Sequence, residues 1–230
     1  MKTIGIIGGM SPESTVVYYR EINRRINAAL GDHHSAQMVL FNVQYQDIKR
    51  CHRAEDWGAA GDLLAEAGVS LKRAGADFLV LATNTMHLVA ARITEATGLP
   101  LLHIAEVTAD RLVRDGVRRV GLTGTRFTME HDFYRRILTD RGLDVVVPEA
   151  AERDAIHRII NDELISGVTT EASRGVFREI VGSLRARGCE GVILGCTEIG
   201  LLIAPEDVVL PTYDTALLHI EAAADLALRG

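Results

Sequence analysis

One cysteine of this chain stands where its thiol could do chemistry. Cys196 follows the apolar run Val192–Leu194 and Gly195. Two polar residues, Thr197 and Glu198, come directly after it. The pattern predicts a strand that ends at the cysteine and leads into a helix, whose N-terminus would lower the thiol pKa and favour the reactive thiolate. A buried cysteine acting as a small apolar side chain is the alternative; the polar neighbours favour chemistry.

A second polar cluster follows another predicted strand. Thr83, Asn84 and Thr85 come directly after an apolar run and supply two hydroxyls and an amide. Such side chains, together with backbone N–H groups, can hold a carboxylate. A helix N-cap without any ligand is the alternative, and the two roles are compatible. His87 lies in the helix expected to follow and is interpreted as a packed or surface histidine rather than a base.

The first predicted strand ends in a glycine turn. Gly8 and Gly9 are followed by Met10 and Ser11. The glycine spacing does not fit G-x-G-x-x-G, and an acidic residue, Glu13, follows where a pyrophosphate would need an uncharged helix start. We interpret the segment as a tight turn at which the backbone approaches a small ligand, and we expect no cofactor.

The elements that must position these residues form an α/β fold. Short runs rich in Val, Ile and Leu alternate with longer stretches of helical period, which is typical of parallel sheets covered by helices on both faces. The predicted strands are Thr3–Ile7, Met38–Val43, Phe78–Ala82, Leu101–Leu102, Val120–Thr123, Val145–Val147, Gly191–Leu194 and Val208–Leu210. The predicted helices include Glu13–Leu30, Trp57–Ala74, Thr128–Asp140, Glu152–Ser166 and Thr170–Arg187.

A weak internal repeat indicates two similar halves. Residues 120–125 and the helix after them resemble residues 4–9 and their helix, and residues 188–198 resemble residues 75–85. Coincidence is the alternative, because any two strand–helix units share a Val/Ile strand and a glycine turn. The repeat favours two pseudo-symmetric α/β domains.

We place the first domain at residues 1–100 plus 212–230 and the second at 101–211. Ligands of open α/β sheets bind beyond the carboxyl ends of the strands. All four repeated segments carry polar residues there, including Thr125 in the second half. If the halves face one another, these segments would line one pocket in the cleft between the domains.

Composition excludes several classes of function. The 230 residues are 47% hydrophobic with a net charge of −6, and no run of like charge offers a footprint for nucleic acid. No apolar stretch approaches the roughly 20 residues that span a bilayer, and no secretory signal is evident, so we expect a cytoplasmic protein without a membrane partner. Cys51, Cys189 and Cys196 lack Cys-x-x-Cys spacing, which argues against disulfides and a metal site. The first two are interpreted as structural.

Together these motifs resemble one family. The segments are Gly8-Gly9-Met10-Ser11, Thr83-Asn84-Thr85-Met86-His87, Gly195-Cys196-Thr197-Glu198 and Asp214-Thr215. Nearly end to end, the chain resembles the aspartate/glutamate racemases that use no pyridoxal phosphate. The resemblance implies two pseudo-symmetric α/β domains, an active site in the cleft between them, usually a homodimer, and two cysteines that flank the Cα of the substrate.

The chain departs from the family at several positions. Thr83 stands where the family commonly has its first cysteine, while Cys196 matches the second. Glu198 stands where cell-wall glutamate racemases have histidine, and their Asp-Ser pair after the first strand is missing. The departures favour the broader amino-acid racemase branch, with a threonine and cysteine pair.

The resemblance implies that Cys196, as thiolate, is the base toward the L enantiomer and that Thr83 faces the opposite side of Cα. The expected substrate-binding residues are Met10, Ser11, Asn84, Thr85, Thr125, Thr197 and Glu198. Possible partners for a distal carboxylate are Gln46, Arg50, Lys72 and Arg126. Two alternatives stay open: a decarboxylase in which one cysteine protonates an enolate, and a noncatalytic amino-acid-binding protein.

Overall fold

The computed structural model describes residues 1–229, which form two compact units. Unit 1 comprises Met1–Ile104 and the C-terminal segment from His219 onward, and unit 2 comprises Ala105–Leu218. No helix among the described residues is both long enough and apolar enough to cross a membrane.

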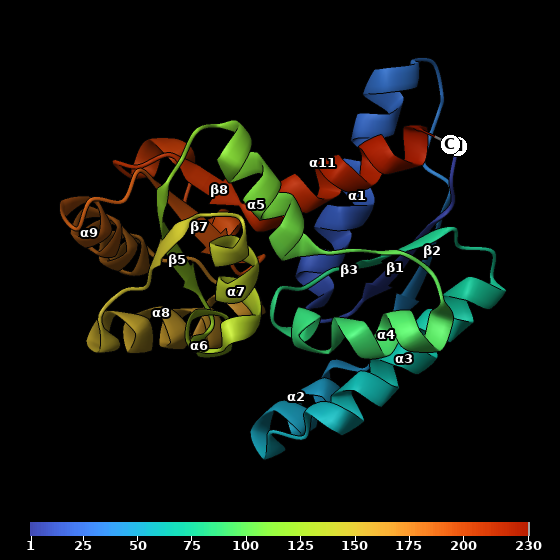
Figure 1. The fold of residues 1–230 in the computed structure, drawn as a ribbon, viewed down its shortest axis with the longest axis horizontal. Helices are drawn as coiled ribbons and strands as arrows, with labels where there is room; N and C mark the ends of the chain where they lie inside the picture. The colour runs from blue at the N-terminus through green and yellow to red at the C-terminus, as the bar shows by residue number, and fades with distance from the viewer. Residues whose placement is uncertain (230) are drawn as a thin grey trace. The chain divides into compact units, whose positions relative to one another are not determined.

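Unit 1 contains one four-stranded parallel sheet with helices on both faces (Figure 1). Its elements are β1 (Ile4–Gly8), α1 (Pro12–Leu30), β2 (Met38–Asn42), α2 (Tyr45–Ala54), α3 (Trp57–Arg73), β3 (Phe78–Leu81), the 3₁₀ helix η1 (Thr85–Val89), α4 (Ala90–Thr97) and β4 (Leu101–Leu102). The strand order is β2-β1-β3-β4. Every residue of β1 and β3 is buried, as expected for central strands covered on both faces.

Two glycines of β1 show how closely the helices approach the sheet. A Cβ on Gly5 would lie 2.7 Å from Ala76 and 3.3 Å from Leu71 of α3. A Cβ on Gly8 would lie 2.6 Å from Thr15 of α1. Because side chains alternate between the faces of a strand, α3 covers one face and α1 the other.

Unit 2 repeats this architecture. Its elements are α5 (Ile104–Arg114), β5 (Arg119–Gly124), α6 (Arg126–Glu130), α7 (Asp132–Asp140), β6 (Asp144–Val146), α8 (Ala150–Asp162), the 3₁₀ helix η2 (Leu164–Ser166), α9 (Glu171–Ala186), β7 (Gly191–Gly195), α10 (Ile199–Leu202), the 3₁₀ helix η3 (Pro205–Asp207), β8 (Thr212–Asp214) and α11 (Thr215–Leu228), which continues into unit 1. The strand order is β6-β5-β7-β8, all parallel. The order repeats that of unit 1 strand for strand, so the predicted class of two similar α/β halves is confirmed.

The last strand differs from the sequence prediction. Val208–Leu210 is not a strand; the strand is β8, which pairs with β7. The apolar run lies in a loop with Val209 57% exposed, and the carbonyl of Pro211 accepts the first hydrogen bond to the sheet, from the N–H of Val192. Because β8 belongs to the second sheet, residues 212–218 group with unit 2, whereas the predicted division places them in the first domain.

Two helix predictions differ in detail. The predicted helix Thr128–Asp140 is two helices, α6 and α7, separated at His131, whose backbone is extended. The predicted helix Glu152–Ser166 begins two residues earlier, behind a capping box formed by Glu149 and Glu152, and its last turn is the separate 3₁₀ helix η2.

Candidate active site

In unit 1 the predicted site residues follow two adjacent strands. β1 and β3 pair in parallel with Ile7 opposite Leu81, so the segments after them begin side by side. Met10 and Ser11 follow β1, and the cluster Thr83 to Thr85 follows β3. All five of these residues are buried. The structure therefore brings together the unit 1 residues that the sequence predicts, at the carboxyl edge of one sheet.

The turn after β1 is held by hydroxyl groups. Ser11 is the N-cap of α1, and its hydroxyl accepts a hydrogen bond from the N–H of Ser14 at 3.3 Å. The hydroxyl of Thr15 accepts from the N–H of Gly9 at 2.8 Å. Gly9 has φ +92°, and a Cβ there would lie 2.5 Å from the carbonyl oxygen of Val43. Only glycine fits this turn, because the conformation is left-handed and the backbone of the next loop occupies the side-chain position.

In unit 2 the predicted residues again follow two adjacent strands. β5 and β7 pair in parallel to their last residues, Gly124 and Gly195. A Cβ on Gly195 would lie 2.4 Å from the carbonyl oxygen of Thr123, so the two strand ends touch without an intervening side chain. Thr125 caps α6 by accepting the N–H of Thr128 at 3.3 Å. Thr125 and Cys196 thus start at the same edge of this sheet.

Cys196 and Glu198 form a direct contact at the end of β7. The Cys196 thiol donates to Oε2 of Glu198 at 3.0 Å, and the Thr197 hydroxyl donates to the same oxygen at 2.8 Å. Cys196 is 7% exposed and Glu198 3%. A thiol and a carboxylate at hydrogen-bond distance can exchange a proton directly. Because both groups are buried, bulk water has little access to either of them.

The pKa of the Cys196 thiol is raised well above its ordinary value, so the predicted lowering is wrong. Burial is the main cause, and the negative charge of Glu198 and its hydrogen bond from the thiol add to it; Asp214 contributes a smaller repulsion. The N–H of Glu198 acts in the opposite direction. The helix after the thiol, α10, is a single turn of four residues, so its dipole is too short to outweigh two carboxylates.

Asp214 belongs to a segment that resembles the family, but the sequence assigns it no role. It ends β8 beside Leu194 of β7, and its Oδ1 accepts the N–H groups of Ala216 and Leu217 at 2.9 and 3.1 Å, which caps α11. Burial raises the pKa of Asp214 to about 6. Its other oxygen, Oδ2, lies against Gly200 of α10, where an added Cβ would be only 2.1 Å away. Asp214 therefore joins the start of α11 to the turn that follows Cys196.

Replacing Gly200 by alanine is expected to destabilise unit 2. The new methyl group would overlap Asp214 Oδ2, so either α10 must move or Asp214 must give up its cap of α11. Overpacking of this kind costs about 1 to 3 kcal/mol. Urea unfolding followed by circular dichroism measures the change in the free energy of unfolding.

Gly182 provides the matched control. It lies inside α9, and a Cβ there would meet nothing within 4 Å. Alanine at this position is expected to stabilise by about 0.5 to 1 kcal/mol, because glycine is a poor helix former. Equal stability of the Gly200→Ala and Gly182→Ala proteins would contradict the proposed contact with Asp214.

The cationic candidates for a distal carboxylate lie in different places. Lys72 donates to the carbonyl oxygen of Thr97 at 2.6 Å, near the end of α3 and before β3 begins, so it lies at the opposite edge of the sheet from Thr83. Arg50 forms an ion pair with Asp47 within α2. Arg126 begins α6 directly after Thr125 and pairs with Asp154 at 2.6 Å. Of these three cations, only Arg126 directly follows a predicted binding residue, Thr125, at the carboxyl edge of its sheet.

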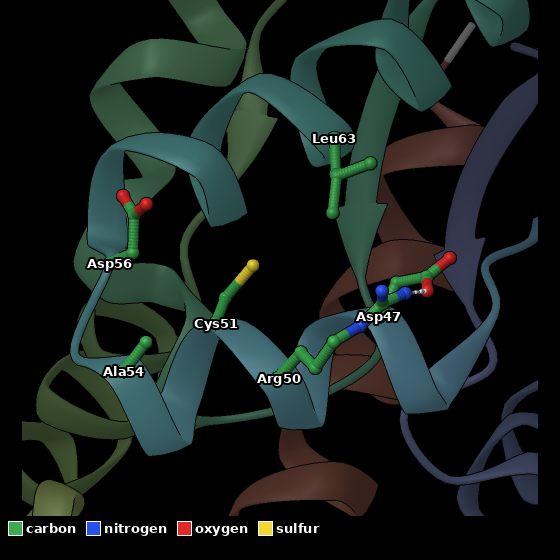
Figure 2. A pocket seen from close by; sticks show the side chains of 6 residues that line it. All are labelled: Asp47, Arg50, Cys51, Ala54, Asp56 and Leu63. Carbon is green, nitrogen blue, oxygen red and sulfur yellow. Dashed lines mark hydrogen bonds and ion pairs between the residues drawn. The ribbon is translucent and has the colours of Figure 1, made fainter.

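A cavity of about 520 Å³ lies between α2 and α3 (Figure 2). Asp47, Arg50, Cys51, Ala54, Asp56 and Leu63 line it. Of these six, Arg50 is one of the possible partners for a distal carboxylate, and the other five are not predicted site residues. Within residues 1–229, no group of three His, Cys, Asp or Glu side chains is arranged to hold a metal ion.

The chain is similar to known proteins along almost its whole length. Residues 7–223 match the family model described as Asp/Glu/Hydantoin racemase. The broad specificity amino-acid racemase RacX of Bacillus subtilis (strain 168) is 22% identical over 223 residues, which cover 93% of this chain and 92% of the relative.

Two solved structures agree more closely. One from Yersinia pestis, described as a candidate Asp/Glu racemase, has 48% sequence identity and a TM-score of 0.93 over 99% of this chain and 100% of the other. An aspartate racemase homologue from Pyrococcus horikoshii OT3 has 35% identity and a TM-score of 0.85 over 99% of this chain and 100% of the other.

Proposed function

The chain belongs to the Asp/Glu/hydantoin racemase family, and from this premise we propose that it racemises a small amino acid, aspartate or glutamate first of all, without a cofactor. The reaction breaks the Cα–H bond on one face of the substrate and forms a new Cα–H bond on the opposite face. One proton leaves and one arrives, so the step needs no oxidant, reductant or co-substrate.

The contact between Cys196 and Glu198 is the observation that carries this proposal. The pair holds one negative charge, which can sit on the carboxylate or, after proton transfer, on the sulfur. We propose that Glu198 takes the thiol proton when substrate is bound and that the resulting thiolate removes the Cα proton of the L enantiomer. The raised thiol pKa keeps the resting cysteine protonated and makes the thiolate a stronger base once it forms.

Thr83 is proposed to return a proton from the other face. A hydroxyl keeps its proton at neutral pH, so Thr83 has a proton to give to the carbanion but is not a base in its resting state. The alkoxide left on Thr83 then takes a proton from water, and the Cys196–Glu198 pair, which now holds one proton more than at rest, releases one to water. Asn84 and Thr85, with neighbouring backbone N–H groups, are proposed to hold the substrate carboxylate. Arg126 is proposed to pair with a distal carboxylate, in exchange for its ion pair with Asp154.

Isotope exchange with each enantiomer separately tests this proposal. In deuterated water, L-aspartate or L-glutamate is expected to gain deuterium at Cα faster than the D enantiomer appears, because Cys196 can remove and return a proton many times before Thr83 completes one inversion. The D enantiomer is expected to exchange slowly. Proton NMR follows the Cα signal, and chiral chromatography follows inversion. Equal exchange of both enantiomers would mean that the two faces are assigned wrongly.

The exchange assay, together with an arylmalonate decarboxylation assay and equilibrium dialysis, separates the racemase from the two alternatives. A decarboxylase would release carbon dioxide from an arylmalonate and leave both enantiomers of the amino acid unexchanged. A binding protein would retain amino acid in equilibrium dialysis and show neither exchange nor decarboxylation. Either result would overturn the proposed racemase activity.

A further inference from the structure

Three histidine side chains of unit 1 lie close together, and one of them, His87, contacts the backbone of Thr83. The ring centroids of His87 and His103 are 4.5 Å apart, and those of His87 and His219 are 5.8 Å apart. His87 is 3% exposed and His219 is fully buried. They lie close together although they come from η1, from the end of the first segment of unit 1 and from α11.

Hydrogen bonds define the state of His87. Its Nδ1 lies 2.8 Å from the carbonyl oxygen of Thr83, and its Nε2 lies 3.3 Å from the backbone nitrogen of Ile104. A carbonyl oxygen only accepts and an amide N–H only donates, so the ring is neutral with its proton on Nδ1. Burial, with the neighbouring His103 and His219, holds the pKa of His87 well below its ordinary value, which agrees with a neutral ring.

His87 therefore connects two backbone positions rather than carrying protons. On one side it holds the carbonyl of Thr83, and its own N–H donates to the carbonyl of Asn84 at 3.1 Å. On the other side it accepts from Ile104, the last residue of unit 1 before the chain enters unit 2. The turn that presents the Thr83 side chain is thus fixed at two successive carbonyls by one residue.

His219 makes a similar bridge that does not involve Thr83. Its Nε2 lies 2.8 Å from the carbonyl oxygen of Leu102, so the proton is on Nε2, and its Nδ1 accepts from the Tyr18 hydroxyl at 2.8 Å. Burial lowers the pKa of His219 to about 4. His219 is as buried as His87 and also neutral, which makes it a matched control.

We propose that His87 is a positioning residue for Thr83, holding the Thr83 carbonyl so that the hydroxyl meets Cα on the face opposite Cys196. This inference rests on the proposed racemase function. It gives a role to His87, which takes no part in the proton transfers themselves. Proton return is sensitive to position, because a displacement of 1 Å can cost a factor of about 100 in rate. Proton removal by Cys196 belongs to another turn, after β7, and does not depend on the Thr83 carbonyl.

Two substitutions separate the bonds of His87. The amide of asparagine replaces Nδ1 and can still donate to Thr83, whereas the longer glutamine replaces Nε2 and can only serve Ile104. For His87→Gln we expect racemisation to fall by about 10- to 100-fold while exchange of the L enantiomer at Cα continues. The ratio of exchange to racemisation rises by the same factor. For His87→Asn most of this ratio is restored to the wild-type value, and for His219→Gln it is unchanged.

Parallel loss of exchange and racemisation in His87→Gln, or an equal change of ratio in His219→Gln, would overturn the positioning role. Absence of any Cα exchange in the unaltered protein would instead refute the proposed function. If a variant does not fold, ¹⁵N NMR of the unaltered protein provides the test. We expect His87 to show a protonated Nδ1 and no titration between about pH 5 and 8; a titrating ring would overturn the proposal.

Discussion

Replacing Cys196 by serine is expected to lower racemisation and L-enantiomer exchange by roughly 10³-fold or more, the upper part of the range for a general acid–base group. Serine nearly conserves the volume of cysteine, and its hydroxyl can still donate to Glu198, so the fold should persist. What is lost is an ionisable group that can become a base, since a serine hydroxyl is far less acidic than a thiol. Chiral chromatography and Cα exchange measure the loss, and circular dichroism checks the fold.

The other two cysteines are the controls. Cys189 is buried in the core of unit 2, and Cys51 is buried at the α2–α3 cavity, where Figure 2 shows its sulfur between the two helices. Neither follows a strand that carries predicted site residues. Cys51→Ser and Cys189→Ser are expected to keep most of the wild-type turnover. Retained activity in Cys196→Ser would remove Cys196 from its assigned role, and loss of activity in Cys51→Ser or Cys189→Ser would contradict the structural role given to that cysteine.

The sequence predicts the α/β class because the strands of each sheet centre are almost entirely apolar. β1 and β7 are buried on both faces, so their runs of Ile, Val and Leu stand out against the amphipathic helices around them. β8 could not be found in this way. It is three residues long, and its sequence Thr-Tyr-Asp contains none of the branched aliphatic residues that mark the other strands, while the more apolar segment before it lies in a loop.

Some features of the candidate site were likewise predictable from the sequence and others were not. Residue type and position after a strand predict that Cys196 and Thr83 lie at the carboxyl edges of their sheets. The role of Thr83 opposite Cys196 came only from the family resemblance. The direction of the thiol pKa was not predictable, since it depends first on the burial of the sulfur, then on the Glu198 side chain turning back toward it and on Asp214 at the end of another strand. The bond from His87 to the Thr83 carbonyl depends likewise on the shape of one short turn.

Replacing Glu198 by glutamine is expected to move two rates of the same thiol in opposite directions. Glutamine removes the nearby negative charge, so the pKa of Cys196 falls and more thiolate is present at a given pH. At a pH below both thiol pKa values, a fall of one pKa unit gives about ten times more thiolate; the less basic thiolate is a weaker nucleophile, so alkylation rises by about threefold. Turnover is expected to fall by about 10- to 100-fold, because the amide cannot accept the thiol proton that the carboxylate takes. Iodoacetamide labelling and racemisation measure the two rates.

Labelling is best measured in protein that also carries Cys51→Ser, so that the cysteine at the α2–α3 cavity does not add to the iodoacetamide signal. Glu190 gives a charge-matched control at the other end of β7, where its carboxylate accepts the N–H groups of Arg118 and Arg119 at 2.6 and 3.3 Å. Glu190→Gln removes the same charge from the chain and is expected to leave alkylation of Cys196 unchanged.

Opposite changes in the two rates are what distinguish a proton acceptor from a residue that only tunes charge. If Glu198 merely suppressed the thiolate, its removal would raise alkylation and turnover together, and the pH dependence of both would shift downward. If it only packed against the sulfur, neither rate would change beyond the effect on stability. Faster alkylation with slower turnover requires that the thiolate be easier to form in the free protein, yet harder to form at the moment when the substrate needs it. A carboxylate that only held the substrate would raise KM and leave kcat unchanged, so faster alkylation together with a lower kcat identifies Glu198 as the acceptor of the thiol proton.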